Sequence, residues 1–260
     1  MSGKQLKAKL AAGERVYGTL ISHALDPAIV NWIPDGSLDF VIFSPEHTAY
    51  DLAEFLPVRY ALAAKGVACL ARTHGRDPAD VAKVCDTYDG VVVPYVEDYE
   101  EAKLLAASAV YRPLKGKLLQ RVLATGQWPS DETRDYIAQK NAETVFIPMI
   151  ESAPAVENLD AICSIPGVDA LFIGPGDLSA NLGIPRKYDD PKLVDTIKQI
   201  IATANKHGIA AGSWFGTTQQ SLRTIEHGAR LVVYGGDGLL LKQAIEQVFG
   251  ALKADGDKDE

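Results

Sequence analysis

Apolar residues recur along the chain in short continuous runs, not in the alternating pattern of a half-exposed sheet. Continuous runs are typical of strands that are buried on both faces, as in a parallel sheet covered by helices. Eight runs predict strands at residues 16–20, 40–43, 68–71, 91–93, 145–150, 170–173, 210–213 and 231–234. Helical spacing between many of them predicts helices at residues 53–65, 78–86, 99–110, 131–141, 191–207 and 219–227.

Strands that alternate with helices indicate right-handed βαβ units. Eight such strands predict a (β/α)8 TIM barrel of parallel strands, a fold that typically needs about 250 residues. An open doubly wound sheet is the alternative, but no GxGxxG motif follows the first predicted strand. We therefore expect one barrel domain over residues 1–252, followed by a polar, disordered tail at 253–260. The connection at residues 111–130 is predicted to be irregular and either functional or an oligomer contact.

Composition narrows the class of partner. The net charge of -8 argues against nucleic acid, because phosphate binding needs a basic surface. No apolar run approaches the roughly 20 residues that cross a bilayer, so we expect no membrane association. Three cysteines without a CxxC spacing, and no apolar signal segment at the N-terminus, favour a cytoplasmic location.

Polar residues collect directly after the predicted strands, and barrel enzymes carry their catalytic groups at the C-terminal ends of strands. Glu151 and Asp177 follow two neighbouring strands, so together they can hold one hard divalent cation such as Mg²⁺. The alternative is that each carboxylate caps the helix that follows it. Aspartate is a favoured N-cap, whereas glutamate is a poor one.

Two basic residues also follow strands. Arg72 can recognise a carboxylate or a developing oxyanion, or else form a structural salt bridge. His47 is a candidate general base, although a single loop histidine is more often an ordinary surface or buried residue.

Three further residues complete the set of candidate ligand contacts. Gly176 lacks a side chain, so its N–H can approach an anion at the start of a helix, or the glycine simply permits a tight turn. Trp214 and Tyr95 either line the pocket or pack in the core.

These residues lie within segments that resemble the HpcH/HpaI aldolases, metal-dependent class II pyruvate aldolases similar to 2,4-dihydroxyhept-2-ene-1,7-dioate aldolase. The resemblance runs from about residue 10 to residue 252. Its carriers are LDFVIFSPEH (38–47), the strand ending at Arg72, GVVVPYVED (90–98), YRPLKG (111–116), FIPMIES (146–152) and VDALFIGPGDLSANLG (168–183).

The resemblance implies a divalent metal ion, Mg²⁺ or else Mn²⁺ or Co²⁺, on Glu151 and Asp177. It also implies that pyruvate chelates this ion, that backbone N–H groups around Gly176 and Asp177 hold its carboxylate, and that Arg72 stabilises the enolate. His47 then belongs to the proton-transfer machinery, and the chain forms a homohexamer built from dimers that exchange C-terminal helices.

The sequence departs from the family pattern at two positions. Ser44 stands where the family usually has the Asp that pairs with the histidine, which gives S-P-E-H in place of D-x-E-H. Cys85 stands where a second Asp is usual, although Asp86 is adjacent. Loss of a carboxylate partner makes an imidazole less basic and less well oriented.

The leading function is reversible aldol cleavage of a 4-hydroxy-2-oxo acid to pyruvate and an aldehyde through a metal-stabilised enolate. The alternatives are another metal-enolate enzyme, which forms citrate or decarboxylates its substrate, and a non-catalytic relative that binds 2-oxo acids.

Overall fold

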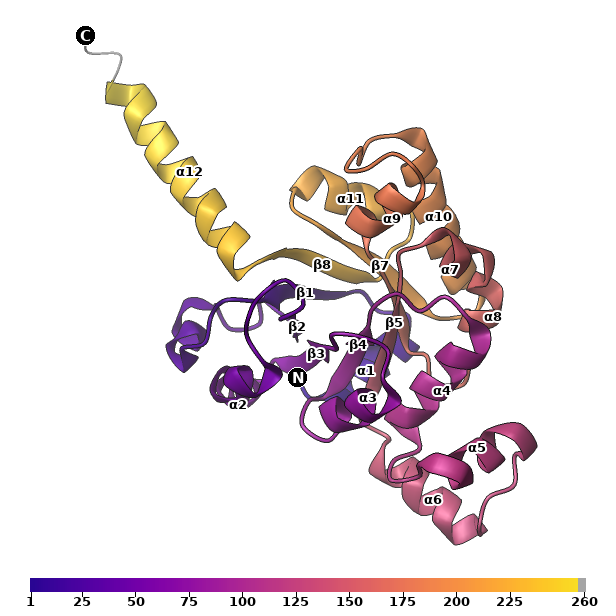
Figure 1. Cartoon of the computed structure of the whole chain (residues 1–260). Helices are drawn as coiled ribbons and strands as arrows, with labels where there is room; N and C mark the ends of the chain where they lie inside the picture. Colours follow the sequence, from indigo (N-terminus) through magenta and orange to yellow (C-terminus); the bar gives the residue numbers. More distant parts are fainter. Residues whose placement is uncertain (257–260) are drawn as a thin grey trace.

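In the computed structural model, which describes residues 1–256, eight parallel strands close into a barrel (Figure 1). The strands follow one another around the barrel in chain order, and β8 pairs with β1 to close it. They are β1 (Val16–Ile21), β2 (Phe40–Phe43), β3 (Ala68–Arg72), β4 (Gly90–Val93), β5 (Val145–Ile150), β6 (Ala170–Ile173), β7 (Ala210–Phe215) and β8 (Leu231–Gly236). Each strand overlaps a predicted run, so the (β/α)8 barrel is confirmed.

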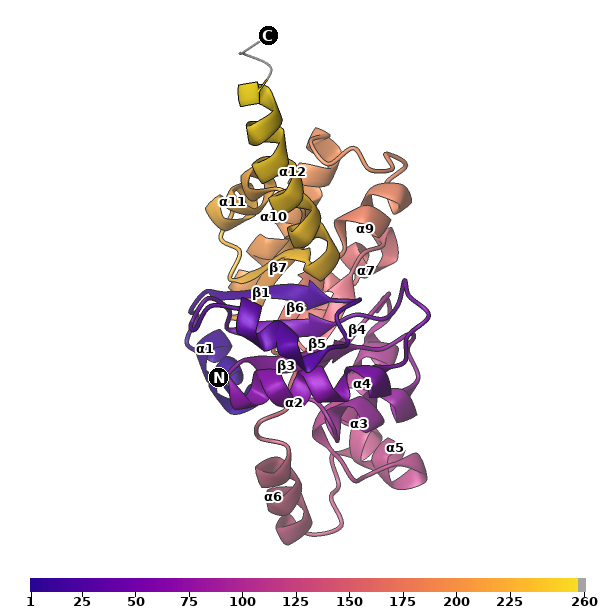
Figure 2. The ribbon, with the colours of Figure 1, turned by 90° about the vertical axis from the view of Figure 1, so that its left-hand side faces the viewer.

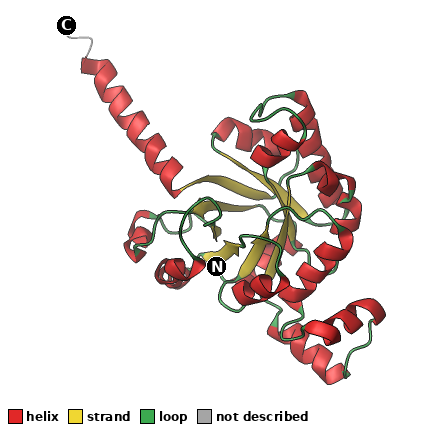
Figure 3. Cartoon of the chain, viewed as in Figure 1, coloured by secondary structure: helices red, strands yellow, loops and turns green. Residues whose placement is uncertain are grey.

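Helices surround these strands, as Figure 3 shows in red around the yellow barrel. The predicted segment 53–65 forms two elements, η2 (Leu52–Phe55) and α2 (Leu56–Ala64). The other predicted helices are α3 (Pro78–Cys85), α4 (Tyr99–Val110), α6 (Asp131–Lys140), α10 (Pro191–Lys206) and α11 (Thr218–Glu226). Elements that were not predicted are α1 (Gly3–Ala11), η1 (Pro27–Trp32), α7 (Ala153–Glu157), α8 (Leu159–Cys163) and α9 (Pro175–Asn181). The C-terminal helix that the resemblance implies is α12 (Asp237–Gly256).

The connection predicted to be irregular at residues 111–130 contains the helix α5 (Gly116–Thr125), so that prediction was wrong. Leu119 and Val122 are buried on one face of α5, and Gly126 ends the helix in the left-handed conformation. Helices α5 and α6 lie together off the side of the barrel in both views of the ribbon (Figures 1 and 2).

Alternate residues of each strand point into the barrel, where their apolar side chains form one interior cluster. On β3 these residues are Ala68 and Leu70, and on β5 they are Val145, Ile147 and Met149. Leu6 and Leu10 of α1 join this cluster, so α1 closes the N-terminal end of the barrel. The other face of each strand packs against the helices in a second, larger cluster. The C-terminal ends of the strands form the opposite end of the barrel, which α1 does not cover.

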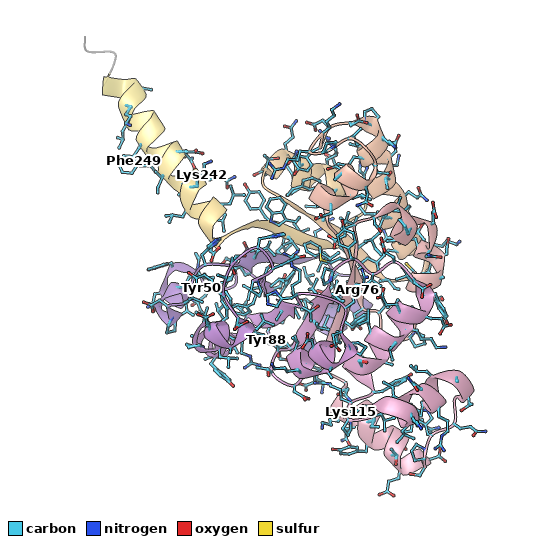
Figure 4. The ribbon with its side chains drawn as sticks, in the orientation of Figure 1. Tyr50, Arg76, Tyr88, Lys115, Lys242 and Phe249 are labelled. Carbon is cyan, nitrogen blue, oxygen red and sulfur yellow. The ribbon has the colours of Figure 1, made fainter. Side chains whose placement is uncertain are left out.

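The last helix leaves the barrel instead of packing on it. Figures 1 and 2 show α12 projecting into solvent, and Figure 4 labels Lys242 and Phe249 along it. Its exposed large apolar side chains are Leu240, Leu241, Ile245, Val248, Phe249 and Leu252. The helix continues through Gly256, which includes the first residues of the predicted tail, and residues 257–260 lie outside the described part of the chain. Among the described helices, α12 included, none has the length and apolar character needed to cross a membrane.

Candidate active site

The two-residue period of the strands places Arg72 and Glu151 at the mouth of the barrel. Arg72 ends β3 in line with the inward-facing Leu70, and Glu151 follows β5 in line with the inward-facing Met149. Because both strands are parallel, these two side chains lie at the same end of the interior. Both residues are buried, so their charges are held away from bulk water.

At this end of the barrel, Glu151 has a pKa far from its ordinary value. It is 2% exposed, and its Oε1 accepts a hydrogen bond of 2.8 Å from the backbone N–H of Tyr95. The pKa of Glu151 is raised to about 7, chiefly by burial and also by the charges of Asp177 and Glu46, while the N–H of Tyr95 and the charge of Arg72 act to lower it. A buried carboxylate with a raised pKa beside a second carboxylate is typical of a site that binds a cation.

Gly174 is required beside Glu151, although the sequence analysis did not identify it. A Cβ at this position would lie 2.1 Å from Oε2 of Glu151, well inside any real contact. The glycine of the GPGD segment therefore makes room for the Glu151 carboxylate itself.

Asp177 lies in the first turn of α9 and is exposed. The N-cap of α9 is Gly174, and the N-cap of α7 is Ser152, whose side chain accepts from Ala155. The alternative that Glu151 and Asp177 serve as helix caps is therefore wrong. Asp177 is close enough to Glu151 for its charge to act on the Glu151 pKa.

Arg72 meets a partner that the sequence analysis did not select, the carboxylate of Glu46. Nη2 of Arg72 lies 2.5 Å from Oε2 of Glu46, and Nη1 lies 3.9 Å from Sδ of Met149. The Nε of Arg72 is buried and has no hydrogen-bond partner among residues 1–256. An unpaired buried donor is costly, so the Arg72 guanidinium retains one N–H for a ligand.

His47 shares the same carboxylate but lies in a different environment. Its Nε2 is 3.7 Å from Oε2 of Glu46, and its side chain is 78% exposed. Ser44 is buried at the end of β2, so Glu46 is the carboxylate that His47 meets within the chain.

Asp86 cannot take the role of the missing carboxylate for His47 of the same chain. It is the C-cap of α3 and forms an ion pair of 2.9 Å with Arg112. Arg112 also donates to Asn141 and Thr144, which lie just before β5 begins. Asp86 is therefore at the N-terminal end of the barrel, opposite Glu151.

Gly176 and Trp214 remain predictions as ligand contacts, and their surroundings permit this role. A Cβ added to Gly176 would meet no atom within 4 Å, so there is open space beside it. Trp214 continues the inward-facing row of β7, and its Nε1 donates to the carbonyl of Gly235 over 2.7 Å.

Tyr95 does more than line a pocket or fill the core. Its φ of 51° is in the left-handed region, which is uncommon for a residue other than glycine. Burial raises the pKa of Tyr95, and the charges of Asp177 and Glu151 contribute in the same direction despite the hydrogen bond from Asn181. Tyr95 thus lies close to both acids.

The donor set fits a divalent cation. Within residues 1–256, no three His, Cys, Asp or Glu side chains are grouped as a metal site. Glu151 and Asp177 are two carboxylates close enough for the charge of one to act on the other. Mg²⁺ commonly takes one or two carboxylates and fills its other positions with water and substrate oxygens. A cation beside Glu151 would also compensate the negative charge that raises its pKa.

A parallel (β/α)8 barrel with two carboxylates and an arginine at the C-terminal ends of its strands is typical of an enzyme. The sequence model of the HpcH/HpaI aldolase/citrate lyase family matches residues 22–244, and the chain belongs to this family. The predicted resemblance is therefore confirmed. The chain is an enzyme of the lyase class, of the metal-dependent class II aldolase type.

Relatives and solved structures agree with this assignment. The 5-keto-4-deoxy-D-glucarate aldolase of Citrobacter koseri is 30% identical over 253 residues, which is 96% of each chain. The crystal structure of an HpcH/HpaI aldolase from Desulfitobacterium hafniense has a TM-score of 0.80 at 27% identity, covering 95% of this chain and 96% of that one. A family protein from Burkholderia cenocepacia has a TM-score of 0.82 at 26% identity, covering 96% and 99%.

Proposed function

We propose that the chain catalyses reversible aldol cleavage of a 4-hydroxy-2-oxo acid to pyruvate and an aldehyde. The observation that carries this proposal is the buried Glu151 beside Asp177, with the unpaired Nε of Arg72 at the same mouth. The relatives named as 5-keto-4-deoxy-D-glucarate aldolases make that sugar acid the first substrate to test.

Glu151 and Asp177 are the residues that would hold the divalent cation, Mg²⁺ or else Mn²⁺ or Co²⁺. When bound there, the cation supplies Lewis acidity toward the keto oxygen of the substrate. Arg72 donates to the same oxygen as it gains charge, because its guanidinium is always protonated and has a free buried N–H. The N–H groups of Gly176 and Asp177 bind the substrate carboxylate, and Trp214 bounds the site.

A base takes the proton of the C4 hydroxyl, the C3–C4 bond breaks, and its electron pair moves into the pyruvate enolate while the aldehyde leaves. Protonation of the enolate at C3 then gives pyruvate. We assign the base to His47, whose neighbour Glu46 can orient and stabilise an imidazolium.

A second candidate function rests on Ser44, which removes the carboxylate usually paired with the histidine. Citrate-forming condensation or decarboxylation needs the cation and Arg72 but not the same base. If His47 is a weak base because it lacks this carboxylate, we expect Ser44→Asp to raise the turnover of aldol cleavage. Proton transfer by a positioned base contributes about 10²–10⁴-fold, so even partial gain is measurable as faster pyruvate release.

The experiment measures pyruvate release from 5-keto-4-deoxy-D-glucarate and other 4-hydroxy-2-oxo acids, with added Mg²⁺, Mn²⁺ or Co²⁺ and with a chelator. Aldolase function predicts cation-dependent release from at least one of them. Exchange of the pyruvate methyl protons without any cleavage would favour the second candidate. If the chain shows neither pyruvate release nor proton exchange, the remaining alternative is a non-catalytic relative that binds 2-oxo acids.

The partners of the proposed enzyme are small molecules and further copies of the same chain. The exposed apolar side chains of α12 support a homo-oligomer in which dimers exchange this helix, and we propose a homohexamer built from such dimers. The cysteines Cys69, Cys85 and Cys163 are all free and buried, which is consistent with a cytoplasmic location.

A further inference from the structure

Tyr95 holds its unusual backbone conformation between two anchors. Its N–H donates to Oε1 of Glu151 over 2.8 Å, and its carbonyl accepts from Nη1 of Arg76 over 2.7 Å. Arg76 comes from the connection after β3 (Figure 4), and its Nε forms an ion pair of 2.8 Å with Glu101 on α4. A strained residue persists only where its surroundings determine its conformation, and these bonds fix the peptide on both sides of Tyr95.

The side chain of Tyr95 reaches a different element. Its hydroxyl accepts a hydrogen bond of 3.2 Å from Nδ2 of Asn181, near the end of α9. The same Nδ2 also donates to the carbonyl of Asp177 over 3.1 Å, one turn earlier in the helix. Tyr95 therefore contacts Glu151 through its backbone and reaches Asp177 through its side chain and a single asparagine.

We propose that Tyr95 is a positioning residue that fixes the spacing of Glu151 and Asp177 and thereby sets the affinity of the chain for a divalent cation. This inference rests on the proposed function, which assigns the two carboxylates to the cation. Glu151 directly follows β5 and Asp177 belongs to α9, so their separation depends on how α9 is held above the strands. Tyr95 follows a third strand, β4, and its hydrogen bonds connect α9 to the end of β5. The hydroxyl matters to this tie, so a phenylalanine of the same shape is not equivalent.

The test measures Mn²⁺ binding to the full chain in the absence of substrate, from the electron paramagnetic resonance signal of free Mn²⁺. Tyr95→Phe removes only the hydroxyl, and we expect it to weaken Mn²⁺ binding by about two- to tenfold, the effect of one neutral hydrogen bond. Asn181→Ala removes the other partner of the same bond, and the double variant should bind no more weakly than the weaker single variant. Tyr136→Phe on α6, away from the barrel, is the matched control and should bind as wild type does.

The outcomes separate this inference from the proposed function. Glu151→Gln is the reference for loss of the cation site. A wild-type chain with no Mn²⁺ binding that depends on Glu151 would overturn both. A wild type that binds, with Tyr95→Phe equal to it or with Tyr95 and Asn181 effects that simply add, would overturn the role of Tyr95 alone. If Tyr95→Phe does not fold, wild-type Mn²⁺ affinity in Asn181→Ala would overturn the role of Tyr95, and weakened binding would support the tie that Asn181 makes to Tyr95 and Asp177 together.

Discussion

Glu151 combines burial, a neighbouring carboxylate and a single backbone donor, and together these raise its pKa to about 7. In the unfolded chain its pKa returns to the ordinary 4.5. Between these values the folded, metal-free chain binds a proton that the unfolded chain has released. The stabilising effect of this proton is fully present below about pH 4.5 and is lost as the pH rises through about 7.

The stability of the metal-free chain should therefore fall with pH relative to Glu151→Gln. We expect wild type to lose up to about 3 kcal/mol of unfolding free energy against this variant between about pH 5 and pH 8, from 1.36 kcal/mol for each pKa unit. Urea unfolding in a chelator measures the difference. Added Mg²⁺ should restore the wild type at the alkaline end, because the cation needs the ionised carboxylate. A difference that does not change with pH would contradict the raised pKa.

A substitution at Gly174 tests whether the position of the Glu151 carboxylate matters for cation binding. Gly174→Ala places a methyl group against Oε2 of Glu151, so the carboxylate must move. We expect this variant to fold but to lose cation binding and lyase activity nearly as fully as Glu151→Gln does. Gly176→Ala is the matched control for folding, since a Cβ there meets open space. Full Mn²⁺ affinity in Gly174→Ala would show that Glu151 is not fixed by this contact.

At the scale of elements, α12 is the helix that leaves most of its large apolar side chains exposed. Its apolar residues have helical spacing, and they stay exposed because the helix turns away from the barrel after Asp237. The side chain of Asp237 accepts from the backbone N–H groups of Ser22, His23 and Ala24, which ties the start of α12 to the loop after β1. These bonds hold the first residue of α12 at the barrel, and the apolar residues further along the helix stay exposed.

Assembly should depend on this apolar face. We expect Leu241→Asp combined with Phe249→Asp to reduce the oligomer to monomers in light scattering with size-exclusion chromatography. Burying two carboxylates without partners in an interface costs several kcal/mol, enough to dissociate it. Lys242→Ala lies on the same helix but removes a charged side chain with a surface ion pair, and it should leave the mass unchanged. An unaltered oligomer in the double variant would mean that α12 is not the interface.

Three of the helices that were not predicted are short. The helices α7, α8 and α9 have 5, 5 and 7 residues, too few to show a helical period in the sequence. The 16-residue helix α10 was predicted because it buries residues at helical spacing against the barrel.

At the scale of the whole molecule, barrel closure was predictable because eight buried runs leave few other topologies. The strand-end rule located Glu151, Asp177 and Arg72, since parallel strands bring their C-terminal ends to one mouth. Glu46, Gly174 and the bonds of Tyr95 could not be predicted in this way. Their roles depend on which loops meet across the mouth and on a backbone conformation that no residue type indicates at position 95.

The central claim is that Glu151, Asp177 and Arg72 act together with a divalent cation to form the enolate of pyruvate. The most direct measurement is exchange of the pyruvate methyl protons in D₂O, followed by NMR with Mg²⁺ or Mn²⁺ and with a chelator. We expect cation-dependent exchange in wild type, none above background in Glu151→Gln or Asp177→Asn, and a rate lower by about 10²–10³-fold in Arg72→Lys, the effect of losing one oxyanion donor. Exchange at the wild-type rate in the carboxylate variants, undiminished by the chelator, would contradict the account.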